Sequence, residues 1–139
     1  MKGQDYDLKD WQEIESSVEL LVEKITEKNQ KFRSISTVSR GGLVPARLVA
    51  DRLDIKQIFV DMETIPGDSL FVDDIYDTGE TFRRIMERVE DPDNLVFATL
   101  FARRKKQHPR QLIYAKLTKN CEYVVFPWDR FEHSVKAPK

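Results

Sequence analysis

The stretch between residues 70 and 81 constrains the fold more than any other part of the sequence. It reads LFVDDIYDTGET, which is an apolar run, two adjacent acids and then a glycine among hydroxyl and acidic residues. This order predicts a buried strand, a loop and the start of a helix, where backbone N–H groups and threonine hydroxyls can bind a phosphate. The adjacent acids, Asp73 and Asp74, would accept hydrogen bonds from sugar hydroxyls or hold a hard cation. Alternatively, the stretch is an ordinary turn after a solvated strand end.

The remaining sequence alternates between helical and strand patterns. Apolar residues at steps of three and four predict a helix after Asp10, which caps its start together with Glu13. Helices are predicted over residues 11–25, 43–53 and 82–89, and strands over residues 32–38, 57–62, 70–75, 95–101, 112–115 and 122–126. This alternation favours the α/β class, with a mainly parallel twisted sheet flanked by helices, in one domain over residues 1–139.

Two of the predicted strands end in unusual residues. Residues 39–42 read SRGG after one strand, and residues 73–81 follow another. Ligands of open parallel sheets bind at the carboxyl ends of the strands. We therefore expect both stretches to lie at one edge of the sheet and to share a ligand.

The composition argues against several classes of function. Hydrophobic residues make up 40% and charged residues 34% of the chain, and the formal net charge is −1, so nothing attracts the chain generally to nucleic acid or anionic membranes. No apolar run approaches the ~20 residues that span a bilayer, and the N-terminus lacks the apolar core of a secretory signal. Cys121 is the only cysteine, which fits a reducing compartment. We expect a cytoplasmic protein without a nucleic-acid or membrane partner.

The sequence also contains one run of four basic residues, RRKK at positions 103–106. No aromatic residue interrupts the run, and the chain as a whole carries no positive charge. These features favour a solvated loop over a nucleic-acid-binding patch.

Residues 72–81 resemble the diphosphate-sugar signature of the type I phosphoribosyltransferases, and SRGGLVPA at residues 39–46 resembles the pyrophosphate loop of their 6-oxopurine members. The short bacterial xanthine-guanine phosphoribosyltransferases are the most similar group. FAR at residues 101–103 and YVVFPWD at residues 123–129 fall where those enzymes carry purine-contacting elements. The resemblance covers nearly the whole chain and implies the type I phosphoribosyltransferase fold.

The resemblance also implies a role for individual residues. Asp77 would be catalytic and manage the proton on the imidazole nitrogen of the purine, and Asp74 would lie close to Mg²⁺, the implied cofactor. Arg40 and the Gly41 N–H would hold the diphosphate, in a loop with a non-proline cis peptide. The full set implied to bind 5-phosphoribosyl-1-diphosphate or nucleotide is Arg40, Gly41, Asp73, Asp74, Asp77, Thr78, Gly79, Glu80 and Thr81. The residues implied to bind the purine are Arg103, Tyr123 and Val124.

The chemistry implied for these residues is physically coherent. Mg²⁺ and Arg40 would neutralise the departing diphosphate while positive charge builds on the sugar. A surface salt bridge is the alternative role for Arg40. For Tyr123 and Val124 the alternative is an ordinary buried strand.

Two departures from the family pattern bear on activity. Arg103 stands where the family usually has a lysine that contacts the 6-oxo group of the base, and the two side chains are not equivalent. Only residues 62–69 separate the second and third strands, so the hood loop, which closes over the substrate in catalytic members, is shortened. Without that lid, water competes with the base for the activated sugar.

Two functions follow from the resemblance. The leading hypothesis is a Mg²⁺-dependent purine phosphoribosyltransferase, which makes nucleoside monophosphate and diphosphate from a 6-oxopurine (guanine, xanthine or hypoxanthine) and 5-phosphoribosyl-1-diphosphate. The alternative is a non-catalytic regulatory module of the same fold that senses the sugar diphosphate or a nucleotide. Transfer to a different acceptor is a third possibility. The family also suggests a homo-oligomer, either a dimer or a tetramer.

Overall fold

The computed structural model describes residues 5–104, 107–119 and 122–129. Lys105 and Lys106 of the basic run, and Cys121, lie outside these residues. A five-stranded sheet with the order β3-β2-β4-β5-β6 lies at the centre, and its neighbouring strands pair in parallel. Its strands are β2 (Ser34–Thr37), β3 (Ile58–Val60), β4 (Ser69–Tyr76), β5 (Phe97–Arg103) and β6 (Leu112–Thr118). The mainly parallel sheet expected from the sequence is confirmed.

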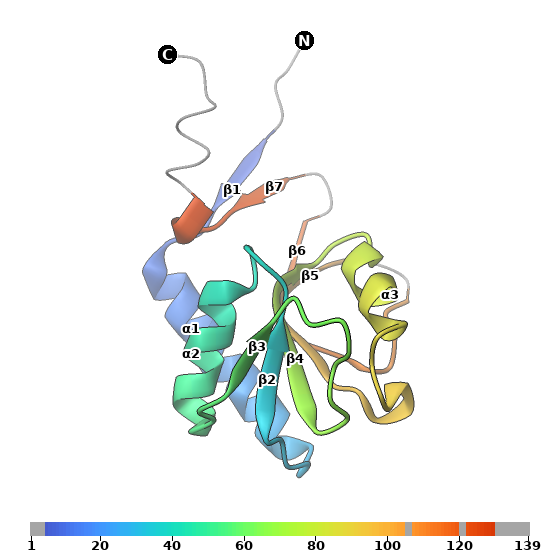
Figure 1. Ribbon diagram of the computed structural model, residues 1–139. Helices are drawn as coiled ribbons and strands as arrows, with labels where there is room; N and C mark the ends of the chain where they lie inside the picture. Colours follow the sequence, from blue (N-terminus) through green and yellow to red (C-terminus); the bar gives the residue numbers. More distant parts are fainter. Residues whose placement is uncertain (1–4, 105–106, 120–121, 130–139) are drawn as a thin grey trace.

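Helices cover both faces of this sheet (Figure 1). The helices α1 (Trp11–Glu27) and α2 (Leu43–Leu53) lie on one face, whereas α3 (Glu80–Met86) lies on the other. Two short 3-10 helices, η1 (Pro92–Asn94) and η2 (Pro127–Asp129), are also present. Within the described ranges, no helix has the length and apolar character needed to cross a membrane.

Two apolar clusters fill the spaces between sheet and helices, and β4 contributes to both. Leu70 and Val72 belong to the cluster under α1 and α2, whereas Phe71 belongs to the cluster on the α3 side, where it stacks on Phe97 at 5.0 Å. A strand covered on both faces reads as a continuous apolar run, which is why β4 and β5 could be predicted from sequence. Their burial fixes the ends of these strands, where the polar loops begin.

The two long helices follow directly from their sequences. The side chain of Asp10 accepts a hydrogen bond from the Glu13 N–H at 2.8 Å, so α1 begins where the capping pattern predicts. Its apolar stripe is buried, namely Ile14, Val18, Leu21 and Ile25. The observed bounds of α2 are those predicted.

The structure contains one strand that the sequence pattern did not predict. The short strand β1 (Tyr6–Leu8) pairs in parallel with β7 (Tyr123–Val125), and the pair is separate from the main sheet. We call β1 and β7 the terminal ribbon, which Figure 1 shows beyond one end of the main sheet. No local pattern marks β1, because its partner lies nearly the whole chain away. The third helix also differs from prediction, since it ends at Met86 rather than at residue 89.

The connection between β3 and β4 is as tight as the sequence predicts. Ile65 is buried; its N–H donates to the Arg88 carbonyl at 2.9 Å, and its carbonyl accepts from the Glu90 N–H at 3.0 Å. The Gly67 N–H also donates to the Glu90 carboxylate at 3.0 Å. These bonds hold residues 61–68 against the segment that follows α3. The connection is therefore fastened to the body of the protein and is not a long lid.

Candidate functional site

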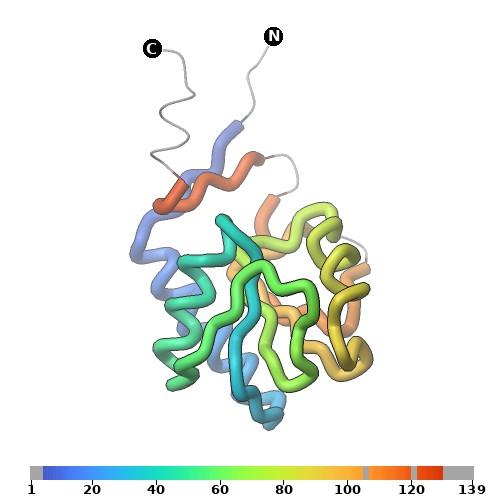
Figure 2. The backbone as a smooth tube through the Cα atoms, in the orientation of Figure 1, coloured from blue at the N-terminus to red at the C-terminus, as the bar shows by residue number. Residues whose placement is uncertain are grey.

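The order of the strands places the two unusual loops together. From β2 the chain passes through α2 to β3 on one side, and from β4 it passes through α3 to β5 on the other. The sheet therefore has its switch point between β2 and β4, where open α/β sheets bind their ligands. Figure 2 shows that the loops after β2 and β4 lie at the same end of the sheet.

The two loops are in direct contact at Gly41. A Cβ atom on Gly41 would lie 2.7 Å from Oδ2 of Asp74, so a larger residue in the first loop would press against the acid at the end of β4. The peptide bond between Ser39 and Arg40 is cis, as the resemblance implied. Residues predicted from separate motifs thus adjoin one another in the fold.

The adjacent acids at the end of β4 are largely withdrawn from water. Asp73 is only 5% exposed, and one of its oxygens accepts the Asp74 N–H at 2.9 Å. Burial raises the pKa of Asp73 well above its ordinary value, and burial likewise raises the pKa of Asp74 to about 6. Two carboxylates that resist ionisation form a site suited to a cation or to hydroxyl donors. Within the described residues, no group of three or more metal-ligating side chains comes together.

The loop from β4 into α3 surrounds a cavity of about 180 Å³. Its lining includes every residue of the predicted phosphate loop, together with the two acids: Asp73, Asp74, Asp77, Thr78, Gly79, Glu80 and Thr81. Gly79 has a φ of 88°, and a Cβ there would lie 2.6 Å from the Tyr76 hydroxyl, so both backbone and space require glycine. The Thr78 hydroxyl accepts the Glu80 N–H at 3.3 Å, which helps to shape the turn.

Asp77 is paired with Arg103, and the sequence did not foresee this contact. Nε of Arg103 donates to Oδ1 of Asp77 at 3.1 Å, and Nη1 donates to the Lys119 carbonyl. The Arg103 side chain is almost fully buried, whereas that of Asp77 is 56% exposed. The guanidinium therefore fixes the orientation of the proposed proton acceptor while leaving that carboxylate open to solvent.

A second cavity, of about 520 Å³, lies beside the loop after β2. Arg40, Gly41, Leu43, Val44, Trp128 and Asp129 line it. Tyr123 and Val124 line neither cavity and lie on the terminal ribbon. Tyr123 is 50% exposed and meets Tyr6 edge-on at 6.0 Å, whereas Val124 is buried. The predicted purine residues are thus divided between the end of β5 and the ribbon.

Asp61 holds the loop after β2 in place, although no sequence motif indicated a role for this residue. Its carboxylate accepts both the N–H of Ser39, at 2.9 Å, and the hydroxyl of Ser39, at 2.5 Å. The hydroxyl hydrogen bond lowers the pKa of Asp61, which keeps the carboxylate ionised. Asp61 thereby holds the residue that precedes Arg40. Asp61 lies directly after β3, at the ligand end of the sheet, but the strand predicted over residues 57–62 included it, so the sequence did not set it apart.

Known proteins resemble this chain in sequence and in fold. No protein-family model matches the sequence. The xanthine-guanine phosphoribosyltransferase of Nitratidesulfovibrio vulgaris is 29% identical over 140 residues, covering 86% of this chain and 82% of that protein. The solved xanthine-guanine-hypoxanthine phosphoribosyltransferase of Helicobacter pylori is 17% identical, with a TM-score of 0.75 over 94% of this chain and 98% of that one. The chain has the phosphoribosyltransferase fold.

The resemblance drawn from residues 39–46 and 72–81 is therefore confirmed. Another solved structure has a similar fold. It is a hypothetical protein of Neisseria gonorrhoeae with bound ppGpp, which is 18% identical, has a TM-score of 0.70 and covers 97% of both chains. Solved proteins of similar fold thus include named phosphoribosyltransferases and a protein with bound ppGpp.

The phosphate loop gives a first testable prediction. Thr81→Val keeps the shape of the side chain but removes a hydroxyl from the cavity wall, so GMP binding should weaken by about 1–3 kcal/mol. Calorimetry on the variant and its parent measures the difference. Thr26→Val, on an exposed turn of α1, is the matched control and should bind as the parent does. Equal GMP affinity in the Thr81 variant and the parent would remove the phosphate assignment.

Proposed function

We propose that the protein is a Mg²⁺-dependent purine phosphoribosyltransferase. It transfers the 5-phosphoribosyl group of 5-phosphoribosyl-1-diphosphate to guanine, xanthine or hypoxanthine, and releases nucleoside monophosphate and diphosphate. The observation that carries the proposal is the contact between the Gly41 loop and Asp74 at the switch point of the sheet. That contact supports the proposal, because the loop after β2 and the end of β4 can then act on one ligand. The name of the Nitratidesulfovibrio relative supports the same activity.

Each loop has a separate task in this reaction. Residues 77–81 hold the 5-phosphate in the smaller cavity, while Asp73 and Asp74 accept hydrogen bonds from the ribose hydroxyls. Arg40 and the Gly41 N–H hold the diphosphate. A nitrogen of the purine imidazole ring then bonds to C1 of the sugar as the bond from C1 to the diphosphate oxygen breaks. Asp77 takes the proton that this nitrogen releases.

The acids at the end of β4 fit a magnesium ion. Magnesium in phosphate-handling sites takes one or two carboxylates and completes its shell with water and substrate oxygens, so a larger cluster of protein ligands is not needed. Burial already makes ionisation of Asp73 and Asp74 costly, and a cation offsets that cost. When bound, the ion neutralises charge on the diphosphate.

Recognition of the purine involves Arg103 and the terminal ribbon. A guanidinium has five N–H donors, so the bonds to Asp77 and Lys119 leave others for an oxygen on the base. Tyr123 has an exposed ring that can stack on a purine, and Val124 offers backbone groups to its edge. We infer that the protein acts in this way as a homo-oligomer, a dimer or a tetramer.

Binding and catalysis can be tested in two successive experiments. Calorimetry with 5-phosphoribosyl-1-diphosphate and Mg²⁺ should show binding, and omission of Mg²⁺ should weaken it. A product assay with hypoxanthine, guanine, xanthine and adenine should then yield monophosphates from the three 6-oxopurines. Binding without any product would reject the enzyme, and absence of binding would reject the site itself.

A regulatory nucleotide-binding module is the second candidate. Two observations favour it: residues 61–68 are bonded to the segment after α3 and provide no lid, and the likeness to the ppGpp-bound Neisseria protein extends over 97% of this chain. A regulatory module would bind nucleotide and form no product. Calorimetry with ppGpp, set beside the product assay, separates the two functions.

The tight connection at residues 61–68 gives a second prediction. An open site gives water the same access to the activated sugar as the purine has. Diphosphate should therefore be released without added base, at an appreciable fraction of the rate with base. The measurement compares release with and without guanine, corrected by a reaction without protein. Release that depends strictly on base would show that the site closes by another route.

A further inference from the structure

Lys9 is a buried cation that the proposed mechanism does not use. The residue is 6% exposed, and its Nζ lies 2.9 Å from Oδ2 of Asp7 and 3.3 Å from Oε2 of Glu13. The same Nζ lies over the ring of Phe101, 4.3 Å from its centroid. Lysine is almost never buried unless it is paired, so this ammonium is held by a specific set of partners.

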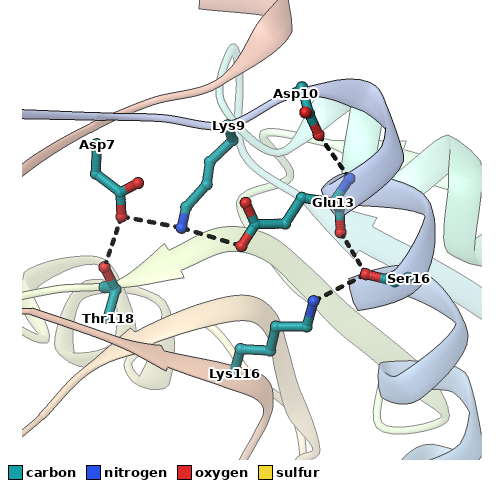
Figure 3. Close-up of polar contacts among 7 residues, drawn as sticks. All are labelled: Asp7, Lys9, Asp10, Glu13, Ser16, Lys116 and Thr118. Carbon is teal, nitrogen blue, oxygen red and sulfur yellow. Dashed lines mark hydrogen bonds and ion pairs between the residues drawn. The ribbon is translucent and has the colours of Figure 1, made fainter.

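These partners belong to three different parts of the fold. Asp7 is in β1, Glu13 is in the first turn of α1, and Phe101 is in β5. Asp7 extends the cluster to β6, because its Oδ2 also accepts the Thr118 hydroxyl at 3.1 Å. Figure 3 shows Lys9 between the two acids, with Thr118 beyond Asp7.

The Lys9 cluster connects the terminal ribbon to the body of the protein. The Lys9 N–H donates to the Val125 carbonyl of β7 at 2.9 Å, while its side chain reaches α1 and β5. The two strands of the ribbon form no part of the main sheet, and an isolated two-stranded ribbon is only marginally stable. The placement of the ribbon over the body therefore depends on side-chain contacts such as these.

The same cluster borders the proposed purine site. Thr118, which holds Asp7, is followed by Lys119, whose carbonyl accepts a hydrogen bond from Arg103. Arg103 in turn holds Asp77. The end of β6 is thus bonded on one side to the ribbon that carries Tyr123 and on the other to the residue that orients the proposed proton acceptor.

We propose that Lys9 is a positioning residue for the purine, acting through the terminal ribbon. The ionic contacts of Lys9 hold β1, and through strand pairing β7, in the position in which Tyr123 and Val124 contact the base. The Lys9 cluster described above includes no residue of the loops proposed for the 5-phosphate and the diphosphate. The affinity of these loops for their phosphate groups should therefore not depend on Lys9. This inference rests on the proposed function, because it assigns the ribbon to the base.

Lys9→Met tests the role of the charge, since methionine keeps an unbranched apolar stem. A mutation that misplaces a substrate can reduce the efficiency of the reaction by up to about 100-fold. KM for guanine should therefore rise by about 10- to 100-fold. KM for 5-phosphoribosyl-1-diphosphate should stay within about twofold of the parent value. Calorimetry should show the same split: GMP binding weakens by a similar factor, and ribose 5-phosphate binding does not change. Lys9→Arg keeps the charge and should recover most of the loss.

Lys116→Met is the matched control. This lysine also joins β6 to α1, through Ser16 at 2.8 Å, but its contact is exposed and does not reach the ribbon. It should leave both KM values unchanged. If circular dichroism shows that Lys9→Met does not fold, Glu13→Gln is the second variant, because it removes one ionic partner of Lys9 and keeps the shape of the side chain. It should raise KM for guanine by about threefold and leave KM for 5-phosphoribosyl-1-diphosphate unchanged.

Several outcomes would overturn the inference. A folded Lys9→Met protein with parental KM for guanine, or with equal losses for both substrates, would show that Lys9 serves stability alone. A parent protein without transfer activity would reject the proposed enzyme, and the ratio of GMP to ribose 5-phosphate affinity would then decide the inference by itself. A parent that binds neither probe would overturn both.

Discussion

Asp77→Asn should reduce turnover of guanine by roughly 10²- to 10⁴-fold while the protein stays folded. Asparagine has nearly the same shape, and its side-chain oxygen can still accept the hydrogen bond from Nε of Arg103. It cannot take up the proton that the purine nitrogen releases. The loss should therefore appear in kcat, with the affinity for 5-phosphoribosyl-1-diphosphate changed much less.

The control for this substitution is Asp93→Asn. Asp93 also forms an ion pair with an arginine, Arg110, but its side chain is 92% exposed and lies in η1. Turnover in this control should equal that of the parent. If Asp77→Asn retained full activity, another group would have to receive the proton, and the ion pair with Arg103 would serve only to shape the loop.

Asp74→Asn should stabilise the ligand-free protein at pH 8 by about 1–3 kcal/mol. Burial raises the pKa of Asp74 to about 6 from an ordinary value of 3.8, so the ionised carboxylate is unfavourable in the empty site. Asparagine carries no charge, and its oxygen can still accept the Ile75 N–H that Asp74 accepts at 2.7 Å. The upper end of the range applies to a fully buried group, and partial exposure of Asp74 reduces it.

The effect should depend on pH with a definite sign. Between pH 3.8 and about 6, the folded state binds more protons at Asp74 than the unfolded state does, so the free energy of unfolding falls as pH rises through this window. The advantage of Asp74→Asn should therefore be present at pH 8 and largely gone at pH 4. Urea unfolding, followed by tryptophan fluorescence at both values, gives the difference between variant and parent. A variant less stable than the parent at pH 8 would contradict the pKa direction.

The parts of the fold that could be predicted are those with a local cause. The bounds of α2 and the start of α1 follow from apolar spacing and capping, and the interior of β4 follows from burial on both faces. The turn between β4 and α3 could be predicted because a glycine marks it, and Gly79 adopts a left-handed backbone there. Each of these signals lies within a few residues of the structure that it specifies.

The parts that could not be predicted depend on residues far apart in the sequence. The pairing of β1 with β7, the ion pair between Asp77 and Arg103, and the hydrogen bonds of Asp61 to Ser39 all join separate elements. An aspartate or arginine in a sequence carries no mark of its partner. The topology of the main sheet brings the ends of β2, β3, β4 and β5 to one edge, where the contacts of Asp77 and Asp61 form, whereas the pairing of β1 with β7 lies outside that sheet.

The terminal ribbon sets an order in which the site can be completed during synthesis. All five strands of the main sheet precede residue 119, so a nascent chain that has reached residue 119 already contains the loops after β2 and β4 and both partners of Arg103. By contrast, β1 leaves the ribosome before the strands of the main sheet, and it cannot pair until β7 has followed β6. Pairings so distant in sequence close slowly. The half of the site proposed for the base therefore cannot form with the main sheet alone, and it forms only once β7 has been translated.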